Sequence, residues 1–222
     1  MKREDATTEK CEQITRLRLQ WVEYRTLFDV AEDAFLTIFE DLVTCYSESW
    51  RFYHTLDHVD EVLRHLKPWL QSAESSKTLF MAAWFHDAVY KPWRKNNEQQ
   101  SAVLAVKTLS ELGWPIEVAT EVGDAIMATY HLSPEETSNQ WAPFVDADLA
   151  ILGAPWADFE SYAYQIREEY RIYPTLLYRK GRIKVLRSFL ERDRIYQCQE
   201  FHQKFEEQAQ ENLQKELALW TR

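Results

Sequence analysis

The chain has 222 residues, enough to bury one substantial core, and we expect a single domain over 1–222. Its formal net charge of -10 argues against nonspecific binding to nucleic acid or an anionic membrane surface, but not against a phosphate-bearing substrate, because a bound metal ion reverses the local charge. The charged N-terminus, the absence of any apolar run of ~20 residues and three widely spaced cysteines predict a cytoplasmic protein without a secretory signal, membrane span or disulfide framework.

Helical periodicity dominates the chain, and no segment alternates as a strand would. We expect Asn97 to cap one helix and Gly113 to close it. A loop over 132–143 should precede an apolar, helix-like run. These patterns predict an all-α, single-domain helical bundle, in which a core at about 50–155 is covered by C-terminal helices at 156–222. The expected helical segments are 8–28, 30–47, 55–70, 77–89, 97–112, 115–130, 144–152, 157–170, 182–195 and 200–219.

An adjacent pair, His86-Asp87, lies in the run Ala82-Ala83-Trp84-Phe85-His86-Asp87-Ala88-Val89, which is apolar on nearly every side. A helix that is apolar all round is buried by the fold, and a buried carboxylate costs several kcal/mol unless a cation or donors satisfy it. A divalent metal ion shared by the two residues would satisfy this requirement, provided that the ion sits off the end of the helix. A buried His-Asp hydrogen bond without an ion is the alternative.

Five further residues, from three segments, make the metal prediction more specific. His54 and His58 are four residues apart on one face of a helix start, although such a pair is more often structural. Asp146 and Asp148 are embedded in an apolar run, and residues two apart in a helix point to nearly opposite sides, so one of them should reach the metal and the other should cap a helix or hold a neighbour. His131 follows a predicted helix and could complete a second metal position or contact substrate.

This ligand set combines imidazole and carboxylate groups without thiolate. Such a set suits Mn²⁺, Fe²⁺, Zn²⁺, Co²⁺ or Ni²⁺ and leaves positions for water and substrate. The sequence does not choose among these ions, nor between one ion and two.

The order of a histidine, an adjacent His-Asp pair and a distant aspartate resembles the HD superfamily of metal-dependent phosphohydrolases. The segment Tyr53-His54-Thr55-Leu56-Asp57-His58 is similar to the YHxxxH motif of cyclic-nucleotide phosphodiesterases, which are relatives of that superfamily. The closest likeness is to a group of small predicted HD phosphohydrolases, and it covers most of the chain. It rests on motifs resembling WFHDxVY, NEQQSA, DADLAILG, IREEY and the segment around Gly181-Arg182.

The resemblance implies an HD-type helical fold and a role for each residue that matches a motif. His58 would be the first metal ligand, followed by His86 and Asp87, with Asp87 able to bridge two ions. Asp148 is favoured over Asp146 as the last ligand. His54 would be the proton donor to the leaving oxygen.

The chain departs from the phosphodiesterases because it lacks their further histidine shortly after the His-Asp pair. Lys91 and Glu98 stand in that neighbourhood instead, and His131 is the candidate for the missing ligand.

The expected function is hydrolysis of a phosphate ester or anhydride, with a nucleotide as the expected substrate, by metal-activated water. The catalytic candidates are His54, Asp87, Glu98 and His131. The candidates for binding phosphate are Lys91, Arg94, Lys95 and Arg182, and those for stacking on a base are Trp84, Tyr90, Trp93 and Tyr130.

Two other interpretations stay open. The metal could be a structural staple in a nucleotide-sensing regulatory module, in which His54 and His131 would be dispensable. The chain could also be a helical interaction protein without metal, whose stability would not respond to chelators. Both of these interpretations are compatible with a homo-oligomer.

Overall fold

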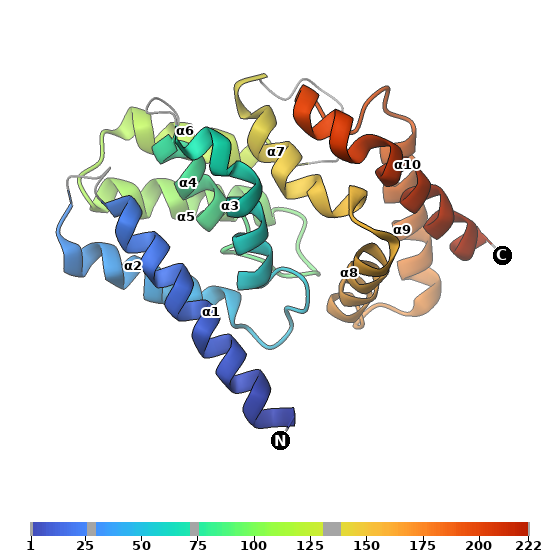
Figure 1. Ribbon diagram of the computed structural model, residues 1–222, viewed down its shortest axis with the longest axis horizontal. Helices are drawn as coiled ribbons and strands as arrows, with labels where there is room; N and C mark the ends of the chain where they lie inside the picture. Colours follow the sequence, from blue (N-terminus) through green and yellow to red (C-terminus); the bar gives the residue numbers. More distant parts are fainter. Residues whose placement is uncertain (1, 26–29, 72–75, 131–138, 222) are drawn as a thin grey trace.

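The computed structural model describes residues 2–25, 30–71, 76–130 and 139–221, and within these ranges it contains helices and no strand (Figure 1). The all-α prediction is therefore confirmed. None of the described helices is both long and apolar enough to cross a membrane. The helices are α1 (Lys2–Tyr24), α2 (Glu32–Tyr46), α3 (Leu56–Leu70), α4 (Ser76–Phe85), α5 (Asn97–Glu111), α6 (Ile116–Met127), η2 (Asn139–Trp141), α7 (Ala142–Asp148), η3 (Leu149–Gly153), α8 (Trp156–Glu169), α9 (Thr175–Leu190) and α10 (Gln199–Thr221).

Helix α4 is the centre of the hydrophobic core. Every residue of α4 except Lys77 is buried, as its apolar sequence predicts, and α3, α5 and α6 pack around it. Trp84 of α4 meets Trp21 of α1 edge-on at 5.1 Å between ring centroids, and Trp21 stacks on Phe35 of α2 at 4.5 Å. These contacts fix the helix that leads into the His-Asp pair.

Helix α4 ends at Phe85, four residues before the predicted end at Val89. Beyond the end of α4, the guanidinium of Arg51 donates hydrogen bonds to the carbonyl oxygens of Asp87, at 2.8 Å, and Ala88, at 3.0 Å. These contacts stabilise the turn that follows the helix. His86 and Asp87 consequently lie in a turn beyond the helix, which the metal hypothesis required.

Helix α5 fastens the segment that follows this turn. Asn97 was expected to cap α5, but it is the first helical residue, and its side chain instead bonds both the amide and the carbonyl of Lys91, at 3.1 and 3.0 Å. Ser101, one turn later, does the same for Val89 at 3.0 and 3.2 Å. Gly113, with a φ of 84°, closes the helix as predicted.

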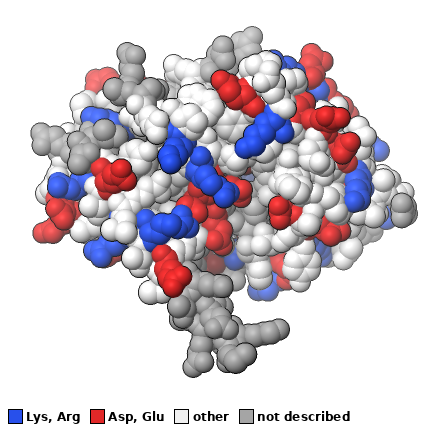
Figure 2. Space-filling view, in the orientation of Figure 1, with Lys and Arg blue, Asp and Glu red and all other residues white. Residues whose placement is uncertain are grey.

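The C-terminal helices pack on the η3 side of the bundle (Figure 1). Helix α9 begins at Thr175, seven residues before the predicted start at Arg182, and Gly181 lies inside it rather than at its boundary. Asn212 of α10 donates to the carbonyls of Leu152 and Ala154 at 2.9 and 2.8 Å, which joins α10 to η3. Over the described part of the face in Figure 2, Lys and Arg side chains are interspersed with Asp and Glu.

Candidate metal centre

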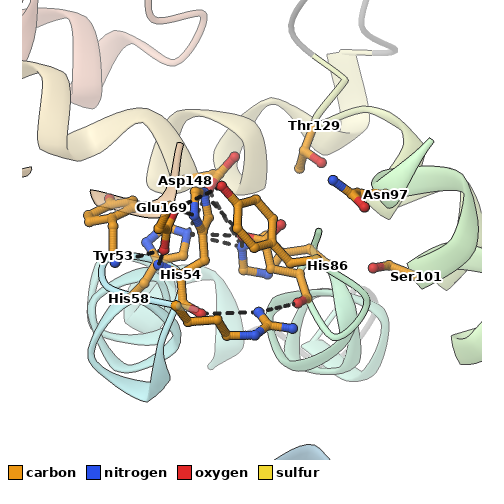
Figure 3. A network of polar contacts seen from close by, with 12 residues as sticks. Tyr53, His54, His58, His86, Asn97, Ser101, Thr129, Asp148 and Glu169 are labelled. Atoms are coloured by element: carbon orange, nitrogen blue, oxygen red, sulfur yellow. Dashed lines mark hydrogen bonds and ion pairs between the residues drawn. The ribbon is translucent and has the colours of Figure 1, made fainter. Parts of the chain in front are cut away.

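Three segments far apart in the sequence bring four predicted ligands together. Figure 3 shows three of them, His58, His86 and Asp148. His58 projects from the first turn of α3, whose N-cap Thr55 accepts a hydrogen bond from the amide of Asp57. His86 and Asp87 follow the end of α4. Asp148 is the last residue of α7.

The ligand atoms are close enough to share one ion. The Nε2 atoms of His58 and His86 are 3.1 Å apart, and Oδ1 of Asp148 lies 3.0 Å from the first and 3.6 Å from the second. One atom from each of these residues lies within 4.8 Å of the others. Oδ2 of Asp87 is 3.1 Å from Nε2 of His86 and 3.7 Å from Nε2 of His58.

The chemistry of these donors fits a cation between them. Nδ1 of His86 is 2.9 Å from the carbonyl oxygen of Ala83 and must donate to it, so Nε2 of a neutral His86 presents a lone pair. That lone pair faces Nε2 of His58 and two carboxylates, all of which are acceptors or can become ligands. The two imidazole side chains are each only 2% exposed, so water screens little of this cluster. A divalent metal ion would satisfy all four groups at once.

The shifted pKa values of His86 and Asp87 also indicate that the cluster favours a positive charge. Burial opposes a charged His86, but Asp87 and Asp148 outweigh it and raise the pKa of His86 to about 10. Burial likewise opposes a charged Asp87, but His86 and His54 hold its pKa well below the usual range. Without an ion, the cluster therefore holds a proton in the same place.

His54 forms a second pair with a residue that the sequence analysis did not single out. Its Nδ1 lies 2.7 Å from Oε2 of Glu169, at the end of α8, and its Nε2 lies 3.9 Å from Oδ2 of Asp87. The ring of Tyr90 stacks on His54 at 4.0 Å, and its hydroxyl donates to the same Glu169 oxygen at 2.7 Å. Glu169 thus orients His54 so that Nε2 points toward the cluster.

Glu169 is buried, and its contacts explain how a charge is tolerated there. Its Oε1 accepts three backbone amide hydrogens, from Phe52, Tyr53 and His54, at 2.8 to 3.0 Å. Burial raises the pKa of the Glu169 carboxyl, but His54 and the amides outweigh burial and lower this pKa to about 2. Burial lowers the pKa of His54, but Glu169 and Asp87 outweigh burial and raise it. Glu169 lies within the IREEY motif, so the resemblance carried a signal for it, but no spacing rule links it to a histidine 115 residues away.

Arg51 is the other functional residue that the sequence analysis missed. Its guanidinium lies 5.1 and 5.5 Å from the ring centroids of Tyr46 and Tyr90, its side chain is fully buried, and Glu48 pairs with its Nε at 3.0 Å. One guanidinium nitrogen donates both to the carbonyl of His54, at 3.1 Å, and to that of Asp87. Arg51 therefore connects the His54 segment to the His-Asp turn.

Asp146 does not join the cluster. It is fully buried and accepts hydrogen bonds from the amides of Gln197 and Cys198, at 3.0 and 2.6 Å, immediately before α10. Burial raises the pKa of this carboxyl, although the amides oppose the rise. Asp148 is therefore the aspartate beside the histidines, and Asp146 holds the start of the last helix.

The predicted phosphate-binding residues lie in different surroundings. Lys91 is half-buried, with its ammonium 5.7 and 6.0 Å from the ring centroids of Trp50 and Trp93, while Arg94 and Lys95 are exposed. Arg182 was expected to bind substrate, but it is buried and forms a two-point ion pair with Glu216, both contacts at 2.8 Å. Because its guanidinium is committed to Glu216, we assign Arg182 to the α9–α10 contact.

The remaining candidates divide in a similar way. Glu98 is half-buried in the first turn of α5, and His131 lies outside the described residues. Trp84 was considered for base stacking, but it is fully buried in the core and cannot meet a ligand. The ring of Tyr90 already stacks on His54, and Trp93 and Tyr130 are exposed.

Comparisons of this chain with protein-family models, with curated proteins and with solved structures gave no match. The site is therefore interpreted from its own geometry, and the resemblance to the HD superfamily stays a prediction based on the motifs.

Proposed function

We propose that this protein is a metal-dependent phosphohydrolase that cleaves a phosphate ester or anhydride, with a nucleotide as the expected substrate. The observation that carries the proposal is the position of the His54–Glu169 pair beside the four-residue cluster. A metal-binding staple needs only the ligands, whereas a hydrolase also needs a proton donor for the leaving group. The distance of 3.9 Å between Nε2 of His54 and Oδ2 of Asp87 supports this role for His54.

Each residue has a defined task in this mechanism. The ion would be held by His58, His86, Asp87 and Asp148, and it would supply Lewis acidity and activate water for attack. Asp87 lies between the ligand histidines and His54, so its carboxylate is positioned to orient the attacking water. His54 delivers a proton from Nε2 to the leaving oxygen, and Glu169 at its Nδ1 stabilises the charged imidazole before delivery.

A catalytically silent regulatory module is the second candidate. The cluster joins α3, the end of α4 and α7, so an ion there would also staple the bundle. The two candidates differ over His54 and Glu169, which a staple does not require.

The first test is metal analysis followed by a screen for phosphate release. The protein is purified, loaded in turn with Mn²⁺, Fe²⁺, Zn²⁺, Co²⁺ and Ni²⁺, and assayed with a panel of nucleotides. We expect His86→Ala and Asp87→Ala to lose metal and activity together.

The decisive variants are His54→Ala and Glu169→Gln. General acid catalysis contributes about 10²–10⁴-fold, so we expect kcat to fall by about that factor for His54→Ala while the metal content stays unchanged. His202→Ala is the matched control, because His202 also pairs with a carboxylate, Glu206 at 3.2 Å, but stands on α10 outside the cluster. Full activity in His54→Ala would support the regulatory module, and a protein that takes up none of the five metals would refute both candidates.

A further inference from the structure

A cavity of about 450 Å³ opens next to the metal cluster, between α3, η3, α8 and α10. Its size is in the range of small-molecule sites. Of the four candidate ligands, His58 alone also lines the cavity, so the cavity and the cluster share this side chain. Nδ1 of His58 is buried and has no hydrogen-bond partner among the described residues.

The wall next to His58 is formed by aromatic rings. The ring centroid of Tyr53 lies 4.8 Å from that of His58 and 4.6 Å from that of Tyr162. Phe52 and the buried Phe205 also line the cavity. Such a surface suits a flat or cyclic organic group, because rings gain from stacked and edge-to-face contacts.

The charges around the cavity disfavour a second phosphate. Three carboxylates line it, those of Asp57, Glu61 and Asp158, against the two cations Arg64 and Lys204. Arg64 already pairs with Glu61 at 2.8 Å. His65 adds no charge at neutral pH, because burial and the nearby Lys204 and Arg64 lower its pKa to about 4. The net charge of the lining is therefore negative.

We propose that this cavity receives the organic part of the substrate, an uncharged, ring-bearing group, while the phosphate lies at the metal cluster. The inference rests on the proposed function and deepens it, since it selects monophosphate esters over substrates with additional phosphates. Hydroxyl and amide groups at Ser161 and Gln165 of α8, one helical turn apart, offer hydrogen bonds to the ring substituents.

The first experiment measures binding without catalysis. Adenosine and thymidine, which carry a ring and no phosphate, are titrated by calorimetry into the metal-free protein. Ser161→Trp places a large side chain in the cavity from an exposed position on α8, whereas Tyr164→Trp places the same side chain on a part of α8 that does not line the cavity. We expect at least one nucleoside to bind the natural chain. Ser161→Trp should weaken this binding at least tenfold, and Tyr164→Trp should leave it unchanged. Circular dichroism checks that both variants are folded.

The second experiment uses the metal-loaded protein. We expect the nucleoside to inhibit hydrolysis of its 5′-monophosphate competitively, and kcat/KM for the monophosphate to exceed those for the diphosphate and triphosphate at least tenfold. The absence of nucleoside binding, noncompetitive inhibition or a preference for the triphosphate would each overturn the assignment of the cavity. If no ester or anhydride is hydrolysed with any metal, the proposed function fails. In that case, nucleoside binding that is abolished by Ser161→Trp would still identify the cavity as a site for an uncharged ring.

Discussion

Two aspartates of one short motif have different surroundings, so one is a structural residue and the other a candidate metal ligand. Asp146 and Asp148 are two positions apart near the end of α7, and their side chains point to opposite sides. One bonds the amides before α10, and the other lies 3.0 Å from Nε2 of His58. The spacing predicted this division, and the resemblance to the HD superfamily favoured Asp148 as the ligand.

The two roles predict opposite results for one conservative change. Asp146→Asn leaves one of the amides of Gln197 and Cys198 without its acceptor, so we expect the free energy of unfolding to fall by about 1–3 kcal/mol while metal binding is retained. Asp148→Asn should instead weaken metal binding at least tenfold and change the stability of the metal-free protein less. Denaturant unfolding and metal titration measure the two quantities, and a loss of metal affinity confined to Asp146→Asn would reverse the assignment.

The residues of the centre were predictable to different degrees. His86 and Asp87 were identified because a charged pair in an apolar helix needs a partner, and His58 because it matches the second histidine of the YHxxxH motif. Glu169 and Arg51 were not identified, because their role depends on contacts with His54 and Asp87 that span 115 and 36 residues. A lone acidic or basic residue is usually solvated, so apart from the IREEY motif around Glu169, the roles of these two residues became visible only in the fold.

At the scale of helices, periodicity located nearly every element, and the errors lie at helix ends. Helix α4 stops at Phe85, and Arg51 binds carbonyls in the turn beyond it, a contact that leaves no pattern in the local sequence. Helix α9 starts at Thr175, directly after Pro174, and continues through Gly181, where an added Cβ would meet no atom within 4 Å.

Gly153 is a position where the contact between two helices does require glycine. A Cβ there would lie 2.5 Å from the carbonyl oxygen of Phe205 and 2.6 Å from its Cβ, so η3 and α10 can approach only without a side chain. We expect Gly153→Ala to lower the free energy of unfolding by about 1–3 kcal/mol, since backbone atoms must move apart. Gly181→Ala is the control and should be neutral or stabilising by up to about 1 kcal/mol. Equal stability of the two variants in denaturant unfolding would contradict the close packing described here.

At the scale of the whole molecule, the four candidate ligands connect elements that otherwise meet mainly through apolar contacts. Residues from α3, from the turn after α4 and from α7 converge on one point. An ion bound there adds its binding free energy to the folded state alone.

Removing the metal should therefore destabilise the protein measurably. At a free metal concentration of about 100 times Kd, the stabilisation is about 2.7 kcal/mol, which for a domain of this size corresponds to a rise in Tm of about 5–10 °C. Thermal unfolding with and without a chelator measures the difference, and His58→Ala should show none. An unchanged Tm for the natural chain after loading with each of the five metals would instead favour a helical protein without a metal.

The position of Glu169 in the chain has a further consequence. All four candidate ligands precede residue 149, whereas the carboxylate that steers His54 comes from the end of α8, beyond the predicted core at about 50–155. In the proposed mechanism, ion binding and proton delivery would therefore depend on different stretches of polypeptide. Substitutions along α8 would then change the acidity and orientation of His54, and with them the range of leaving groups, without disturbing the candidate ligands.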